Sequence, residues 1–291
     1  MAAIERIFHT PNPIIGVVHL LPLPTSPRWG GTLETVLARA EQEATALAAG
    51  GVDGLIVENF NDVPFTKGQV DPAVVSAMSL VVHRLQLLVA LPLGLNVLRN
   101  DGCSALAIAA CTGAKFIRVN VLSGTMVTDQ GVIEGNAYQL LRYRRELGAD
   151  VQIFADVLVK HARPLGGANP IAAVKDTVER GLADGIILSG WATGHPPSLD
   201  ELEMARAAAP NTPMLIGSGA NADNIGSFLK VADGAIVASS LKRHGQIEQP
   251  IDPIRVQRFM DAVRHSIKAK AEARIEPVAS SPPTSTTMRQ R

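Results

Sequence analysis

Cysteine, net charge and long apolar runs are all scarce in this chain of 291 residues. Its two cysteines, Cys103 and Cys111, fall in one predicted helix, about 12 Å apart along its axis and beyond disulfide reach. They also match no metal-ligand spacing. We therefore interpret them as small buried hydrophobic residues in a reducing compartment, and we predict neither a bound metal nor a cofactor.

The balance of charge argues against a nucleic-acid partner. Lysine plus arginine equals aspartate plus glutamate at 27 each, so no overall field attracts a polyanion. The most apolar window, Val74 to Leu98, contains Arg84 and Pro92 and is expected to break into a helix and a strand. The opening residues have no apolar core of an export signal. Any membrane association is therefore expected to be peripheral.

Short apolar runs alternate with segments of helical period along the chain. This pattern is typical of repeated βα units, and its eight pairs predict a (β/α)8 TIM barrel. We predict one barrel domain over residues 1–272 and a disordered tail over 273–291, which is rich in Pro, Ser and Thr. The predicted strands are Ile14–Val18, Gly54–Val57, Leu93–Val97, Phe116–Val119, Gln152–Ala155, Gly185–Leu188, Met214–Ile216 and Gly234–Val237. The predicted helices start near Thr32, Asp71, Asp101, Tyr138, Ile171, Leu199, Asp223 and Asp252.

Polar side chains follow the predicted strands at the face where barrels carry their sites. Candidates for proton transfer are Asp156, Glu58 and His19, and candidate cations are Arg118 and Lys160. The amides Asn59, Asn96 and Asn120 and the hydroxyl of Ser189 are candidate ligand contacts.

Each of these residues has a structural alternative. The amides and Ser189 could satisfy loop backbone groups, and the histidines His19 and His161 could be ordinary buried ones. Arg118 could form a structural ion pair with Glu58 or Asp156 across the barrel mouth. Lys160 could form a Schiff base, but its place beyond the strand favours a solvated loop residue.

Two stretches suggest ligand contacts made by loops. Gly217, Ser218 and Gly219 follow one strand, while Ser239 and Ser240 follow the next. Small residues at adjacent strand ends allow backbone N–H groups to converge on an anion, so we predict a phosphate cup there. The sequence Asp129-Gln130-Gly131 is either a lid over the site or a plain surface turn.

Several of these stretches together resemble the BtpA family of photosystem I biogenesis proteins. The matching pieces, spread over about residues 7–265, are GVVHLLPLP from Gly16, ENFNDVPF from Glu58, NVLRND from Asn96, FIRVNV from Phe116, DQGVIEG from Asp129, ADVLVKHA from Ala155, SGWATG from Ser189, GSG from Gly217 and SSLK from Ser239. The sequence departs from the family pattern at Thr25, Asn61 and Ala238, where glycine is usual. Alanine at 238 is expected to narrow the phosphate cup.

The resemblance implies a TIM barrel and a role in the accumulation of photosystem I reaction-centre subunits. It also implies a peripheral position on the cytoplasmic side of the thylakoid membrane, with those subunits or their assembly intermediates as partners. Family members in organisms without photosynthesis imply an older small-molecule activity. Three functions therefore remain open: a biogenesis factor, an enzyme acting on a phosphorylated metabolite, and a sensor whose ligand tunes docking. A monomer and a homo-oligomer both fit the sequence.

Overall fold

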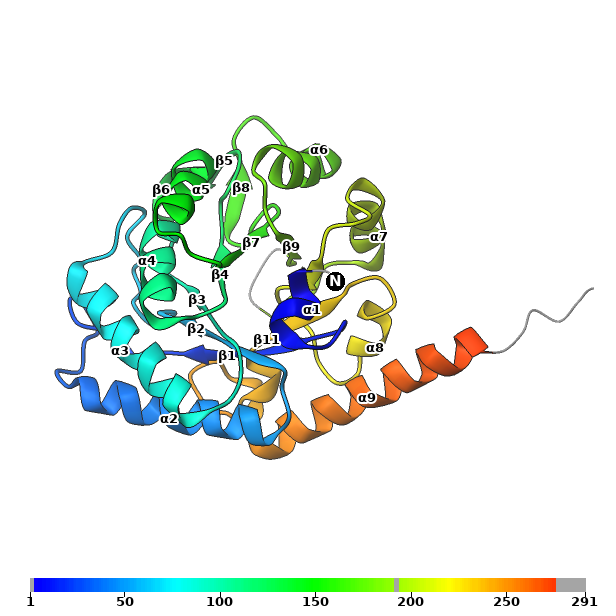
Figure 1. Cartoon of the computed structure of the whole chain (residues 1–291), viewed down its shortest axis with the longest axis horizontal. Helices are drawn as coiled ribbons and strands as arrows, with labels where there is room; N and C mark the ends of the chain where they lie inside the picture. Colours follow the sequence, from blue (N-terminus) through cyan, green and yellow to red (C-terminus); the bar gives the residue numbers. More distant parts are fainter. Residues whose placement is uncertain (1–2, 191–193, 276–291) are drawn as a thin grey trace, which may run out of the picture.

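The computed structural model describes residues 3–190 and 194–275. Its main feature is a closed barrel of parallel strands in the order β1-β11-β10-β9-β7-β4-β3-β2, surrounded by helices (Figure 1). The (β/α)8 fold is therefore confirmed. The barrel strands are β1 (Ile14–His19), β2 (Gly54–Glu58), β3 (Leu93–Asn96), β4 (Phe116–Val119), β7 (Gln152–Asp156), β9 (Gly185–Leu188), β10 (Met214–Ile216) and β11 (Gly234–Val237).

The outer helices begin where N-cap residues and prolines favour them. Asp71 and Asp101 accept hydrogen bonds from backbone N–H groups of the first turn, and Ser198 forms a capping box with Glu201. The helices are α2 (Leu33–Ala49), α3 (Pro72–Leu88), α4 (Gly102–Thr112), α5 (Ala137–Glu146), α6 (Pro170–Lys175) continued by the π-helical η1 (Asp176–Arg180), α7 (Leu199–Ala208), α8 (Ile225–Phe228) and α9 (Pro253–Ile275).

The barrel interior is a packed core that is closed at one end by a short helix. Phe116 and Phe154 fill its centre, and α1 (Ala3–Phe8) places Phe8 edge-on against Phe116 at a ring-centroid distance of 5.4 Å. Figure 1 shows α1, in blue, across this end of the barrel. The sequence did not predict α1, because six residues are too few to show a helical period.

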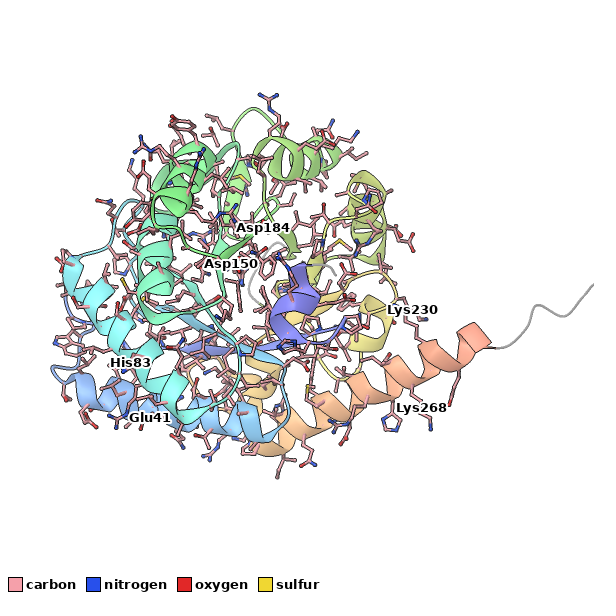
Figure 2. The ribbon with its side chains drawn as sticks, in the orientation of Figure 1. Glu41, His83, Asp150, Asp184, Lys230 and Lys268 are labelled. Atoms are coloured by element: carbon pink, nitrogen blue, oxygen red, sulfur yellow. The ribbon has the colours of Figure 1, made fainter. Side chains whose placement is uncertain are left out.

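Three Asp-Gly pairs fix strand starts at this closed end. Asp53, Asp184 and Asp233 each accept a hydrogen bond at 2.8 Å from the backbone N–H of the first or second residue of the preceding barrel strand. Figure 2 shows Asp184 beside this end of the barrel. The following glycine avoids a clash, since a Cβ at Gly54 would lie 2.5 Å from the Phe8 ring. The closed end is thus held by packing and strand-fixing contacts, and in this fold a functional site is expected at the opposite end.

The structure adds a small sheet over the open end. The hairpin of β5 (Thr125–Thr128) and β6 (Gly131–Glu134) pairs with β8 (Ala162–Pro164) to form a three-stranded antiparallel sheet. Val121, Met126, Ile133 and Val159 make a separate apolar cluster beneath it. Asp129 and Gln130, for which the sequence left a lid and a plain surface turn as alternatives, therefore form the tip of a hairpin whose position is fixed by packing.

Two sequence predictions need correction. Cys111 is exposed and Cys103 is half-buried, so neither is the fully buried residue that we expected, although both lie in α4. Helix α9 continues to Ile275, past the predicted domain end at 272. The rest of the predicted tail, residues 276–291, lies outside the described residues. No helix in the described part of the chain is long and apolar enough to cross a membrane.

Candidate active site at the open end of the barrel

Strand register brings the predicted polar residues together at the open end. His19 pairs with Glu58 across β1 and β2, and Glu58 pairs with Asn96 across β2 and β3. Arg118 and Asp156 come from the neighbouring strands β4 and β7, and all five side chains are buried. Because these parallel strands end at the same face, residues distant in sequence become one cluster.

Arg118 is the centre of this cluster. Its Nε donates to Asp156 Oδ2 at 2.8 Å and its Nη2 donates to Asp156 Oδ1 at 2.9 Å, while Nη1 lies 3.5 Å from Glu58 Oε1. Burial lowers the pKa of Arg118, but the charges and hydrogen bonds of Asp156, with Glu58, outweigh burial and raise it. Asn120 also donates to Asp156 Oδ2 at 2.8 Å. The Asp156 carboxylate is therefore fully engaged, which disfavours its use as a free base.

Glu58 is the second acidic group of the cluster. Burial raises its pKa, but His19, at 3.6 Å from Nε2 to Oε2, and the charge of Arg118 lower it to about 2. Asn96 donates to Glu58 Oε1 at 3.1 Å. Burial lowers the pKa of His19, whose ring stacks on Phe60 at a centroid distance of 4.5 Å. Glu58 is thus an ionised acceptor beside a neutral imidazole.

Two further cations lie in the loops above the strands. Arg99 donates to Asn120 Oδ1 at 3.3 Å and to the backbone oxygen of Lys160 at 2.8 Å. Lys160 is partly buried, not solvated as the sequence suggested, and burial, followed by the charge of Arg118, lowers its pKa to about 8. Sequence reasoning missed Arg99 because it lies three residues beyond its strand, inside the NVLRND motif.

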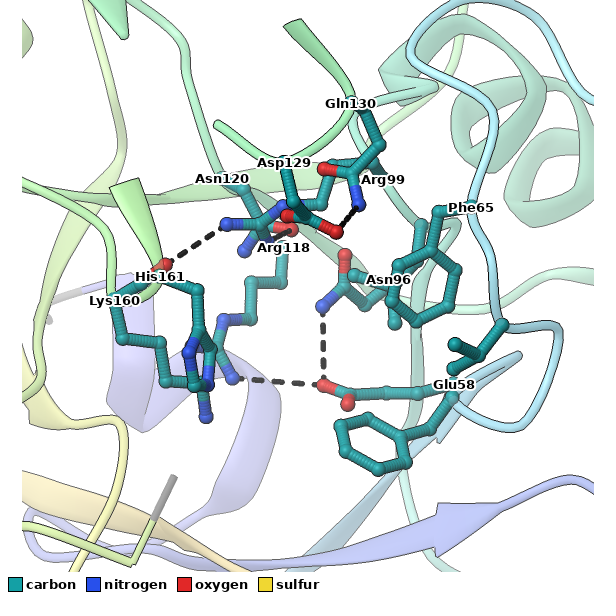
Figure 3. A pocket seen from close by; sticks show the side chains of 13 residues that line it. Glu58, Phe65, Asn96, Arg99, Arg118, Asn120, Asp129, Gln130, Lys160 and His161 are labelled. Atoms are coloured by element: carbon teal, nitrogen blue, oxygen red, sulfur yellow. Dashed lines mark hydrogen bonds and ion pairs between the residues drawn. The ribbon is translucent and has the colours of Figure 1, made fainter. Parts of the chain in front are cut away.

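These groups surround a cavity of about 450 Å³, which we call the mouth cavity (Figure 3). One wall is apolar and comes from the loop after β2, and the opposite wall is cationic. Figure 3 shows Asn96 and Glu58 on one side, Arg118 and Lys160 on the other, and Asp129 and Gln130 above them. The lining residues are Glu58, Phe60, Val63, Phe65, Asn96, Leu98, Arg99, Arg118, Asn120, Asp129, Gln130, Lys160 and His161. This combination suits a small ligand with an anionic group.

The predicted phosphate cup is a smaller adjoining cavity of about 30 Å³. It is lined by Gly217, Ser218, Gly219 and Ser239, together with His19, Glu58, Arg118 and Lys160. Gly219 has a φ of +76°, and a Cβ there would clash with Pro196, so glycine is required. Ala238 has a φ of −127°, outside the left-handed region, so its backbone conformation does not need glycine.

Two of the three serine hydroxyls in the predicted cup already have acceptors. Ser218 Oγ donates to the His195 backbone oxygen at 2.9 Å, and Ser240 Oγ donates to the Ala220 oxygen at 2.8 Å. Among the described residues, no acceptor is recorded for the backbone N–H groups of Ser218, Gly219, Ser239 and Ser240. An anion in the cup would therefore be held by backbone N–H groups.

The remaining predicted residues have mixed surroundings. Asn59 accepts from the Leu98 N–H at 2.7 Å and donates to Asp62 at 3.0 Å, so it joins two loops and fits the structural alternative. Within the described residues, the buried Oγ of Ser189 has no hydrogen-bond partner. Residues 191–193 of the predicted SGWATG motif lie outside the described residues.

Lys242 of the SSLK motif lies away from the cup. Its Nζ donates to both carboxylate oxygens of Glu43 in α2, at 3.0 and 3.2 Å, and both side chains are 1% exposed. Among the described residues, no group of three or more His, Cys, Asp or Glu side chains is placed to hold a metal ion.

The closed barrel and the buried polar cluster at its mouth define a TIM-barrel protein with a polar cavity at the open end. The BtpA family model matches residues 10–265, and the chain belongs to the BtpA family. It is 70% identical to the photosystem I biogenesis protein BtpA of Synechocystis sp., over 91% of this chain and 92% of that protein. An uncharacterized protein of Thermococcus kodakarensis is 44% identical over 87% of this chain and 95% of its own length.

A solved structure of similar fold is N-(5'-phosphoribosyl)anthranilate isomerase from Pyrococcus furiosus. It superposes with a TM-score of 0.52 and 15% sequence identity over 87% of this chain and all of that chain. At this level of identity the likeness concerns the fold alone.

Proposed function

We propose that this protein supports photosystem I biogenesis and that it binds a small anionic, phosphate-type ligand at the barrel mouth. The observation that carries the biological role is the 70% identity to the Synechocystis protein of that name, over nearly the whole of both chains. The ligand is supported by Arg99, Arg118 and Lys160, three cations that converge on one cavity. Beside it lie backbone N–H groups of the cup that have no acceptor among the described residues. By this proposal, the partners are reaction-centre subunits or their assembly intermediates, reached from the thylakoid surface.

Genetic replacement tests this role. A Synechocystis strain that lacks its own 70%-identical protein should regain photosystem I reaction centres when it expresses this chain. The number of reaction centres is measured by the light-induced oxidation of their chlorophyll. If the number of photosystem I reaction centres stays low although this chain accumulates to the level of the missing protein, the result would count against the proposed role.

A pair of matched substitutions tests whether the mouth cavity matters for that role. Val63→Glu adds a negative charge to the cavity wall at a side chain that is 37% exposed. Val132→Glu makes the same change on β6 at a side chain that is 43% exposed and lies outside the cavity lining. We expect Val63→Glu to fail in the replacement and Val132→Glu to succeed, because only the first repels an anion from the site. Equal success of the two variants would show that the role in photosystem I biogenesis does not depend on the mouth cavity.

A second candidate function is enzymatic action on a phosphorylated metabolite. Lys160 favours it, because an amine with a pKa of about 8 in a partly buried site is a usable nucleophile or base at neutral pH. The relative from Thermococcus also supports an activity outside photosynthesis, since the family is not confined to photosynthetic organisms. The two functions are compatible, because a biogenesis factor can retain a catalytic site.

A further inference from the structure

Lys160 occupies an unusual position, because its side chain lines three separate cavities. These are the mouth cavity, the small cup beside Gly217–Gly219, and a third cavity of about 290 Å³ between the loops that follow β7 and β9. The third cavity also contains Ser189, whose buried Oγ has no partner among the described residues. A group attached to the Lys160 amine would therefore have room on several sides.

The surrounding chain fixes the backbone of Lys160 firmly. Leu158 and His161 on either side have φ values of 52° and 57°, a region that non-glycine residues rarely adopt. Val159 is buried in the apolar cluster beneath the small sheet, and the Lys160 backbone oxygen accepts the 2.8 Å hydrogen bond from Arg99. Leu158 and Ala162 also pack against this cluster, so the segment that carries Lys160 is held on both sides.

The amine at the end of this side chain has no recorded partner. No hydrogen bond or ion pair joins Lys160 Nζ to another described residue, whereas the buried Lys242 is fully paired with Glu43. Burial, followed by the neighbouring charge of Arg118, disfavours the ammonium form of Lys160 and lowers its pKa. A partly buried, unpaired amine next to other cations is the arrangement in which lysine acts as a nucleophile toward carbonyl carbons.

We propose that Lys160 forms an imine with the carbonyl carbon of a phosphorylated aldehyde or ketone. In this step the neutral amine nitrogen bonds to the carbonyl carbon, and the carbonyl oxygen leaves as water with both nitrogen protons. The phosphate lies toward Arg118 and the backbone N–H groups of Ser218 and Gly219, and the carbon chain extends into the mouth cavity. This inference rests on the enzymatic function proposed above and specifies its substrate class and its nucleophile.

Reductive trapping tests the imine directly. The purified full chain is incubated with dihydroxyacetone phosphate and sodium borohydride, and adducts are located by peptide mass mapping. We expect an adduct on Lys160 in the wild type and none at position 160 in Lys160→Arg. Lys67→Arg is the matched control, because Lys67 is an exposed lysine on the same face, and it should keep the Lys160 adduct. Absence of a Lys160 adduct in the wild type, or trapping spread evenly over surface lysines, would overturn the proposal.

Two further measurements guard against a variant that fails to fold. Inorganic phosphate should protect Lys160 of the wild type from trapping, and unphosphorylated dihydroxyacetone should label it less at equal concentration. Equal labelling by both ketones would overturn the phosphorylated substrate class. If dihydroxyacetone phosphate raises the melting temperature yet leaves Lys160 unmodified, the imine is refuted while the ligand site of the proposed function stands.

The pH dependence supplies a readout that nonspecific labelling would not share. Groups that face the Lys160 amine are Glu58 on β2, Arg99 after β3, Arg118 on β4 and Asp156 on β7. Burial, together with the charges of these groups, lowers the pKa of the Lys160 amine to about 8. The initial rate of adduct formation should therefore rise with pH through that value. A rate that keeps rising toward the ordinary lysine pKa, near about 10.4, would show that a solvated amine reacts instead.

Discussion

Arg118 on β4 holds Asp156 on β7 by two parallel hydrogen bonds of 2.8 and 2.9 Å, and both side chains are buried. This bidentate pair joins neighbouring strands directly beneath the mouth cavity. In the sequence, Asp156 resembles a catalytic base because it is an acid at a strand end. In the structure, both of its carboxylate oxygens accept from Arg118, so its geometry is that of an anchor for Arg118.

Asp156→Asn should therefore destabilise the fold and not act as a simple catalytic knockout. The substitution removes the carboxylate charge beside the buried Arg118 guanidinium and leaves the longer ion pair to Glu58, and loss of one charged partner of such a pair costs about 3–5 kcal/mol. Urea unfolding measures this cost. Glu41→Gln, which removes a half-exposed partner of the exposed Arg84, is the control and should cost about 0–1 kcal/mol. A fully stable Asp156→Asn protein without activity would restore Asp156 as a candidate base.

Glu58 should give the protein an acid-sensitive component of stability. Its pKa is lowered from 4.5 to about 2 in the folded state, so its contribution is present above pH 4.5 and is lost as the pH falls toward 2. The shift corresponds to roughly 3 kcal/mol. Urea unfolding at a series of pH values should show this loss in the wild type and a flatter acid limb in Glu58→Gln. Identical acid limbs in the two proteins would contradict this assignment.

Lys242 and Glu43 should behave as a structural pair that does not take part in the site. Lys242→Met leaves the Glu43 carboxylate buried with only Arg39 beside it and should destabilise the protein by about 3 kcal/mol or more. The double variant Lys242→Met with Glu43→Leu should recover much of that loss, because no uncompensated charge stays buried. Equilibrium unfolding of the single and double variants decides the matter, and strictly additive losses would argue against a coupled pair.

The sequence predicted the barrel well because each strand is a short buried apolar run between turn residues. It missed the three-stranded sheet, since Thr125–Thr128 and Ala162–Pro164 are half-exposed and lack an apolar period. That omission explains the error at Lys160, whose burial depends on this sheet and on Arg99. Residues at strand ends, such as Glu58 and Arg118, were predictable because the fold sets their position.

Inorganic phosphate or a sugar phosphate should raise the melting temperature with the logarithm of its concentration. A ligand at 100 times its Kd stabilises the folded state by about 2.7 kcal/mol, and each kcal/mol is worth roughly 2–4 °C for a domain of this size. A thermal-shift titration with phosphate-containing metabolites measures the effect. Val63→Glu should weaken it and Val132→Glu should not, because only Val63 lines the cavity. A flat response across the whole panel would contradict an anion site at the barrel mouth.

Thylakoid association, if the proposed role holds, should be reversible by salt. The described residues include no membrane-spanning helix. Helix α9 instead has a row of exposed cations, namely Arg255, Arg258, Arg264 and Lys268. Figure 2 shows Lys268 on the outside of the barrel. Attraction between such cations and anionic headgroups is screened within about 10 Å at 0.1 M salt. Washing thylakoid membranes with high salt or carbonate should therefore release the protein into the supernatant, as detected by immunoblotting. Retention equal to that of an integral reaction-centre subunit would contradict a peripheral contact, and release in low-salt buffer alone would show that the membrane contributes little to its position.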